Sequence, residues 1–284
     1  MKNKFIKLTR ALLPALVGIA LLSCDDEHVF QQLEQPVAAN AASVKFIHTA
    51  IGPAGTNFTI NYFGNDNVKY TPMAISTGLP IGFGVGGAFP ASINYGTVVA
   101  GKQSMKIVIP ATATVPESLL LTEELTLEAG KRYSNFLVGF PAYTNYTIAD
   151  DFSVASDPKL CYVRFINAIT NTPAAGYDLV VTKTVPATST APSFVKEVAK
   201  FSNIGYLAGS TAFIAMEPNL QTESIAYAVQ LRTPGTTTVI ASTTLTPRSS
   251  RIYTFFSRGR VGGLSAGAPS ATVNIPAITF YTNR

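Results

Sequence analysis

The chain has 284 residues with 21 basic, 16 acidic and 13% charged side chains overall, for a net charge of +5. Four basic residues lie within the first ten positions, and the rest of the chain is almost neutral, without a basic patch, so the charge gives no evidence for a nucleic-acid partner and none is predicted. Abundant Thr, Val, Ile, Tyr and Phe, with 21 Gly and 18 Pro scattered among them, predict an all-β chain of short strands and tight turns.

The first 23 residues are predicted to be a lipoprotein signal peptide. A basic start precedes the apolar run 11–22, which is too short to cross a bilayer, since that requires roughly 20 residues, but has the proportions of a signal-peptide core. The run ends in Leu21-Leu22-Ser23-Cys24, which resembles the lipobox of bacterial lipoproteins. This resemblance implies cleavage before Cys24 and a diacylglycerol on its sulfur, so we expect the membrane to be a partner.

Residues 24–42 are predicted to be the lipidated cysteine and a polar tether. The acidic cluster 25–27 resembles the surface-export signal of Bacteroidetes lipoproteins, whereas in enteric bacteria an aspartate beside the cysteine would indicate inner-membrane retention. We adopt the first interpretation and expect a cell-envelope protein, lipid-anchored in the outer membrane and exposed at the surface. The rest of this segment has no apolar periodicity, as is typical of a linker.

The remaining chain repeats itself, which predicts two modules, 43–157 and 158–284. Matching segments in the same order indicate duplication. The matches pair Ser43–His48 with Tyr162–Asn167, Phe58–Ile60 with Tyr177–Leu179, Asn94–Gly96 with Asn203–Gly205, Met105–Ile109 with Ala212–Met216, and Tyr133–Phe136 with Tyr253–Phe256. The boundary is placed near Pro158, because proline is excluded from interior strands.

Each copy is expected to form an Ig-like antiparallel β-sandwich of about seven strands. Alternation is clear in 225–233, and the longest helix-like period covers only 193–201. The inward faces are expected to bury a set of repeated aromatic residues, namely Phe46, Phe165, Tyr133, Tyr253, Phe136 and Phe256.

The repeated pattern resembles Ig-like modules of a domain-of-unknown-function family, found singly or in tandem in secreted and lipid-anchored bacterial proteins. The opening strand, V-[KR]-F-[IV]-[HN], is present as Val44–His48 and as Val163–Asn167. The resemblance covers most of residues 43–260. It implies an Ig-like fold, and it carries no catalytic residue and no agreed ligand.

Residues able to perform catalysis are scarce. His28 lies in the tether, and His48 lies at a strand end where a hydrogen-bonded structural role is expected. With Cys24 lipidated, Cys161 has no disulfide partner and is expected to be a small buried side chain. No G-x-S-x-G elbow is present. We therefore predict that the chain is not an enzyme and has no catalytic residue.

Cofactor and metal motifs are not convincing either. Segment 82–87 satisfies G-x-G-x-x-G, but Pro80 and Pro90 flank it and no helix is predicted to follow, so it reads as a glycine-rich mobile loop of unknown role. Residues 64–67 and 150–151 could offer oxygen ligands to calcium, but turn chemistry explains them better. Glu123 and Glu124 are expected on opposite faces of a strand. No metal and no cofactor are predicted.

The leading hypothesis is a non-catalytic cell-envelope lipoprotein, an adhesion, scaffold or binding module with a protein or glycan partner. One alternative is a glycan-binding lipoprotein accessory to an outer-membrane importer, although the chain has no Trp. Another is a pilus or fibre subunit joined by strand addition, in which 272–282 would be the strand able to leave; more simply, this segment is the edge strand of the second module. A hydrolase is the remaining alternative. The aromatic candidates for ligand binding are Phe83, Tyr95, Tyr143 and Tyr146.

Overall fold

The computed structural model describes residues 39–284 apart from 72–74, 77–78, 81, 92, 210–211 and 220–223. The predicted signal peptide, Cys24 and nearly all of the tether lie outside the described residues. The described part consists of strands and two short 3-10 turns, which confirms the all-β prediction. It contains no helix of the length and apolarity needed to cross a membrane.

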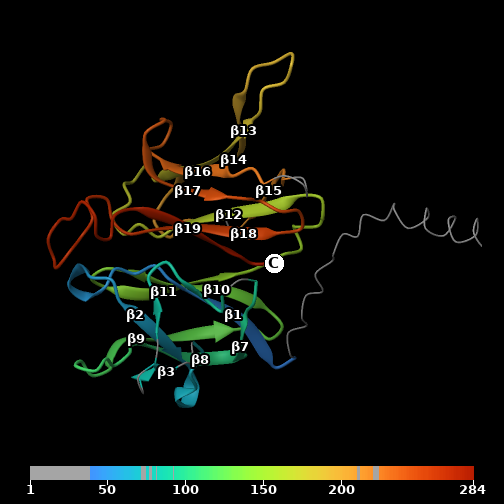
Figure 1. Ribbon diagram of the computed structural model, residues 1–284. Helices are drawn as coiled ribbons and strands as arrows, with labels where there is room; N and C mark the ends of the chain where they lie inside the picture. The colour runs from blue at the N-terminus through green and yellow to red at the C-terminus, as the bar shows by residue number, and fades with distance from the viewer. Residues whose placement is uncertain are drawn as a thin grey trace, which may run out of the picture. The chain divides into compact units, whose positions relative to one another are not determined.

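The first sandwich packs two sheets against each other (Figure 1). One sheet has the order β11-β10-β1-β6, with β7 also paired to β1, and the other has the order β5-β2-β8-β9. The strands are β1 (Ala41–His48), β2 (Thr59–Phe63), β5 (Phe83–Gly84), β6 (Ala88–Phe89), β7 (Gly96–Val99), β8 (Gly101–Ile109), β9 (Ser118–Leu127), β10 (Arg132–Gly139) and β11 (Tyr143–Ala149). A separate short hairpin joins β3 (Ile75–Ser76) to β4 (Leu79–Pro80).

The second sandwich has the same plan, with sheets β15-β12-β18-β19 and β14-β13-β16-β17. Its strands are β12 (Cys161–Asn167), β13 (Tyr177–Val185), β14 (Phe194–Ile204), β15 (Ile214–Met216), β16 (Tyr227–Arg232), β17 (Val239–Leu245), β18 (Ile252–Arg258) and β19 (Ala277–Thr282). Two sandwich-like units are therefore confirmed. Most pairs are antiparallel, but β1 with β10 and β12 with β18 are parallel.

The first and last matching segments occupy equivalent strands. Val44 lies opposite Tyr133 in one copy, and Val163 lies opposite Tyr253 in the other. Each tyrosine hydroxyl accepts a hydrogen bond from a backbone N–H five residues upstream, of Glu128 at 3.0 Å and of Arg248 at 3.1 Å. This tyrosine corner is typical of Ig-like sandwiches.

Two of the matches were wrong, Asn94–Gly96 with Asn203–Gly205 and Met105–Ile109 with Ala212–Met216. Gly96 lies in β7, which pairs with β1, whereas Ile204 lies in β14, which pairs with β13. Segment 212–216 contains β15, which pairs with β12 as β7 pairs with β1, so it corresponds to β7 and not to 105–109. Segment 105–109 lies in β8, whose partner is β2, and the equivalent strand is β16, whose partner is β13. The wrong match of 105–109 with 212–216 arose because alternating apolar strands resemble one another in sequence. In addition, β14 is much longer than β5, so positions counted along the two copies no longer correspond after these strands.

The helix-like period at 193–201 also belongs to a strand, β14. Glu197 and Ala199 lie opposite adjacent residues of β13, so Val198 is an extra residue in a bulge. The bulge interrupts the period of two, and this interruption produced the helix-like spacing. By contrast, the alternation predicted for β16 is confirmed, with Tyr227, Val229 and Leu231 buried.

Both sandwiches have apolar cores, but not every repeated aromatic residue lies in them. Phe46 and Tyr133 belong to the first core, and Phe165 and Tyr253 belong to the second. Phe136 and Phe256 are also buried, yet they belong to a third cluster with Ile47, Ile148, Ile166 and Tyr281. This cluster contains residues of both sandwiches, so the expectation that these two phenylalanines face inward was wrong.

The four larger sheets form a stack of four layers (Figure 1). The sheets that contain β1 and β12 are the two middle layers, and the third apolar cluster lies between them. The rings of Phe136 and Phe256 meet edge to face with centroids 6.0 Å apart. Because equivalent residues meet each other, the contact has the self-complementary character of an interface between two related copies.

The predicted division between the modules falls in the connection from β11 to β12. The described residues belong to one compact unit, which continues across this connection. The boundary between 157 and 158 stays a prediction.

Candidate functional site

Two cations lie at equivalent positions between the sandwiches. Lys45 on β1 and Arg164 on β12 are fully buried, each on the face of its strand that points away from its own sandwich core. The Lys45 ammonium donates to the carbonyl oxygens of Pro90 at 3.1 Å and Asn94 at 2.5 Å. Burial lowers the pKa of Lys45 to about 8, and the charge of Asp150 opposes this shift. The layer between the sandwiches therefore contains buried charges as well as the apolar cluster.

Asp150, just after β11, forms a buried ion pair with Arg164 across the interface. The carboxylate also accepts hydrogen bonds from the Ser134 hydroxyl at 2.7 Å and the Tyr95 hydroxyl at 2.8 Å. The Arg164 Nε donates to the Thr254 hydroxyl at 2.9 Å. Hydrogen bonds of this kind are what a buried ion pair requires, because the Coulombic attraction alone does not offset the desolvation of both charges.

The network repeats in the second copy with one change. The N–H of Asp150 donates to Arg132 O, and the N–H of Asn283 donates to Ile252 O, so Asp150 and Asn283 are equivalent. The Thr254 hydroxyl donates to Asn283 Oδ1 at 2.7 Å, as the Ser134 hydroxyl does to Asp150. The first copy therefore has a carboxylate, that of Asp150, at the position where the second copy has the amide of Asn283.

Aromatic rings cover both cations. The Lys45 Nζ lies 4.9 Å from the centre of the Tyr95 ring, and the Arg164 Cζ lies 4.8 Å from that of Phe213. Such contacts stabilise a desolvated cation by about 2 kcal/mol or more. Asn283 Nδ2 donates to the Tyr95 hydroxyl at 2.9 Å, which links the network of one sandwich to the other.

A second contact joins the sandwiches at the loop ends. Asn274 Nδ2 donates to Gly55 O at 2.7 Å, and both groups are buried. The Arg258 side chain lies against the turn at Gly86, where a Cβ atom would come within 2.7 Å of the Arg258 Nε. Contacts at two separate places restrict rotation of one sandwich about the other.

The four aromatic candidates for ligand binding are all partly exposed and all make contacts within the chain. Tyr95 belongs to the buried network, and the Tyr143 hydroxyl donates to Ile51 O at 2.9 Å. The Tyr146 ring packs 6.4 Å from Phe136, and the Phe83 ring stacks 6.2 Å from that of Tyr62. The structure does not bring the four together at one place, and their binding role stays a prediction.

The glycine-rich segment 82–87 is a short strand and a turn rather than a mobile loop. Phe83 pairs with Ile60, and the N–H of Gly86 donates to His48 O at 2.7 Å. The segment continues into β6 and not into a helix, as expected for a chance match to the dinucleotide motif.

The two residues considered for catalysis are held in the cores. His48 is fully buried, its Nε2 lies 3.2 Å from Phe58 O, and burial lowers its pKa to about 3. Cys161 is fully buried, and burial raises the pKa of its thiol to about 12. The burial expected of Cys161 and the hydrogen bond expected of His48 are confirmed, and the absence of a catalytic role stays a prediction.

The turns considered for calcium are explained by their own hydrogen bonds. Asn65 Oδ1 accepts from the N–H of Ser104 at 2.8 Å, and Asp151 accepts from the N–H of Ser153 at 2.9 Å. Among the described residues, no group of three or more His, Cys, Asp or Glu side chains could hold a metal ion. Glu123 binds Thr144 while Glu124 pairs with Lys102, so the two glutamates face opposite ways as predicted.

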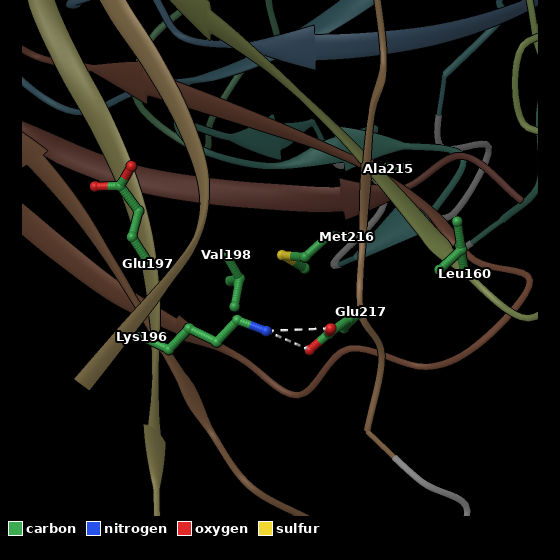
Figure 2. Close-up of a pocket in the computed structure, with 7 residues that line it drawn as sticks. All are labelled: Leu160, Lys196, Glu197, Val198, Ala215, Met216 and Glu217. Carbon is green, nitrogen blue, oxygen red and sulfur yellow. Dashed lines mark hydrogen bonds and ion pairs between the residues drawn. The ribbon is translucent and has the colours of Figure 1, made fainter. Parts of the chain in front are cut away.

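A small cavity opens at the edge of the second sandwich (Figure 2). It lies between β14 and β15, the terminal strands of the two sheets. At its rim the Glu217 carboxylate accepts from Lys183 at 2.8 Å and from Lys196 at 3.1 Å. This double ion pair connects β15 to the β13–β14 hairpin.

Sequence reasoning missed the network between the sandwiches. Asp150 was interpreted as a turn residue, and its partner Arg164 lies on another module. One signal was present: Lys45 and Arg164 recur in the middle of otherwise apolar opening strands. A charged residue at such a place indicates a second buried face with a partner.

The fold and the network define a tandem β-sandwich protein whose two copies pack face to face. Residues 42–175 match the model of a family described as a domain of unknown function (DUF4397), which spans the first sandwich and β12. No curated protein matches the sequence significantly.

Solved structures show a distant similarity. The fimbrial anchor protein Mfa2 from Porphyromonas gingivalis is 7% identical, with 86% of this chain and 97% of that chain covered and a TM-score of 0.28. A proposed cell adhesion protein from Bacteroides eggerthii is 12% identical, with 88% and 97% covered and a TM-score of 0.21. Another from Parabacteroides distasonis is 9% identical, with 86% and 99% covered and a TM-score of 0.18. No conclusion about this chain follows from scores at this level.

Proposed function

We propose that this chain is a non-catalytic cell-envelope lipoprotein, anchored through a lipid on Cys24 in the outer membrane, that presents its sandwiches at the surface as an adhesion or scaffold module. The observation that carries the proposal is the Asp150–Arg164 network, which joins the two sandwiches into one body. Sheets in contact lie about 10 Å apart, so four layers hold the outermost sheet about 30 Å from the first. Two sandwiches joined in this way would hold the surface of one outer sheet at a fixed distance from the other outer sheet, which suits a presenting role.

Two observations support a role without catalysis. His48 is the histidine that a triad would have to use, and it is buried and hydrogen-bonded to a backbone carbonyl. The Cys161 thiol is buried with a raised pKa, whereas a nucleophilic cysteine requires a lowered one.

The anchor is tested by detergent phase partition of the full-length protein and its Cys24→Ser variant after expression in a bacterium that processes lipoproteins. The wild type is expected in the detergent phase, since each buried CH₂ contributes about 0.8 kcal/mol, and the variant in the aqueous phase. Equal partition of the two proteins would refute the anchor. Protease treatment of intact cells then tests surface exposure.

The glycan-binding alternative remains as an outcome of a glycan-array screen on residues 33–284, the compact unit. Saturable binding that is lost on replacing Phe83 or Tyr143, both partly exposed, would favour glycan capture. An array without binding would favour a protein partner. The fibre alternative through a departing 272–282 segment receives no support, because Ile278 and Tyr281 of β19 are buried in two different clusters.

A further inference from the structure

The longest strand in the outer sheet of the second sandwich has a free edge. β14 is terminal in the order β14-β13-β16-β17, and the strand pairings of the described residues join it to β13 alone. A terminal strand offers a row of N–H and C=O groups that another extended chain can bind.

The hairpin that carries this edge extends beyond the sheet (Figure 1). β16 pairs with β13 only as far as Thr182, so 183–185 and 194–196 pair only with each other. At this end Phe194 is 54% exposed and Val195 is 66% exposed. A two-stranded ribbon is marginally stable in water, and this one exposes one large apolar side chain on each of its two faces.

The cavity beside β14 is suited to a side chain. Its apolar wall consists of Leu160, Val198 and Met216, and its volume is about 210 Å³ (Figure 2). Small-molecule sites usually measure about 300–1,000 Å³. The cavity opens between the terminal strands of two sheets, where an inward side chain of an added strand would enter.

The charges of β14 oppose pairing with a second copy of the chain. If two copies of β14 paired antiparallel about a twofold axis, the residue on the axis would lie opposite the same residue of the other copy. An axis at Lys196, Glu197 or Lys200 would therefore place like charges opposite each other. An axis at Val198 places Lys196 opposite Lys200. Like charges at directly opposite positions are destabilising. Four of the five symmetric registers centred on residues 196–200 are therefore unfavourable.

Glu197 offers a complementary position to a different chain. Its carboxylate points away from the Lys196–Glu217 ion pair (Figure 2), and no ion pair joins it to another described residue. We propose that the free edge of β14 binds an extended segment of a different protein by strand addition. In this arrangement an aliphatic side chain of the partner enters the cavity, and a basic side chain lies opposite Glu197.

The test uses isotope-labelled residues 33–284 and a synthetic peptide in which Val alternates with Thr and one central Thr is replaced by Lys. We expect saturable NMR shifts and slowed amide exchange along 194–200. Glu197→Lys should weaken binding roughly five-fold, since one exposed charge pair is changed from attraction to repulsion, and the peptide with Glu in place of Lys should restore it. Glu124→Lys, on terminal strand β9 of the other outer sheet, is the matched control and should leave binding unchanged.

A peptide with methylated backbone nitrogens removes the donors that strand addition needs and should not bind. Equal binding of this peptide, protection elsewhere than β14, or no saturable binding would overturn the proposal. Dimerisation in sedimentation experiments with protection of β14 would identify a second copy as the occupant instead. The inference rests on the proposed presenting role, but the Cys24 partition experiment does not involve β14, so the two can fail separately.

Discussion

At the scale of single residues, the buried ion pair is the feature on which most depends. Asp150 and Arg164 are each bound by several polar groups, and neither carries exposed side-chain surface. Removing one member leaves an uncompensated buried charge, which costs more than the pair contributes.

Asp150→Asn is therefore expected to reduce the free energy of unfolding by about 3–5 kcal/mol, because Arg164 remains buried without its counter-ion. Urea unfolding followed by circular dichroism measures this. Asp151→Asn, at the exposed neighbouring position, is the control and should change stability little. Similar stabilities for the two variants would show that the ion pair does not hold the interface.

His48 makes stability depend on pH in acid. Its pKa is about 3 in the folded protein and 6.5 in the unfolded chain, so the unfolded state binds more protons between these values. Stability should be fully present above pH 6.5 and fall as the pH decreases towards 3, by up to about 4 kcal/mol. His48→Asn, which copies the residue at position 167, should remove this part of the pH dependence in acid unfolding curves.

At the scale of elements, the two tyrosine corners fix the entry into β10 and β18. Tyr133→Phe and Tyr253→Phe each remove one hydrogen bond to a backbone N–H and are each expected to cost about 1 kcal/mol. Thermal unfolding of both variants checks this. An effect in only one copy would mean that the two corners are not equivalent.

Periodicity in the sequence was sufficient to predict the strands and the equivalence of the first and last matching segments. It was not sufficient to predict on which face of a strand each residue lies. Tyr133 and Phe136 are an odd number of positions apart, so a strand places them on opposite faces, and Phe136 could not join the core that buries Tyr133. The apolar run through 136–138 indicated a strand covered on both faces. The partner of Arg164 was not predictable, since no local pattern connects it to Asp150.

At the scale of the whole molecule, the two sandwiches should unfold together. The third apolar cluster and the ion pair couple them, so calorimetry of residues 33–284 is expected to show one transition. Phe136→Ala removes the ring contact with Phe256, is expected to cost about 3–5 kcal/mol, and should separate the transition into two. Two transitions in the wild type would contradict the coupling.

The face-to-face packing of equivalent strands has a consequence for how such an interface can be encoded. Two separate identical chains meeting in this way would depend on concentration, whereas two copies in one polypeptide meet at a high effective concentration whatever the amount of protein. When both copies are in one polypeptide, they also no longer need to have the same sequence. A symmetric dimer would have to carry aspartate at both equivalent positions or at neither, but here Asp150 faces Arg164 while Asn283 occupies the other position, a one-sided charge arrangement that two identical chains cannot have.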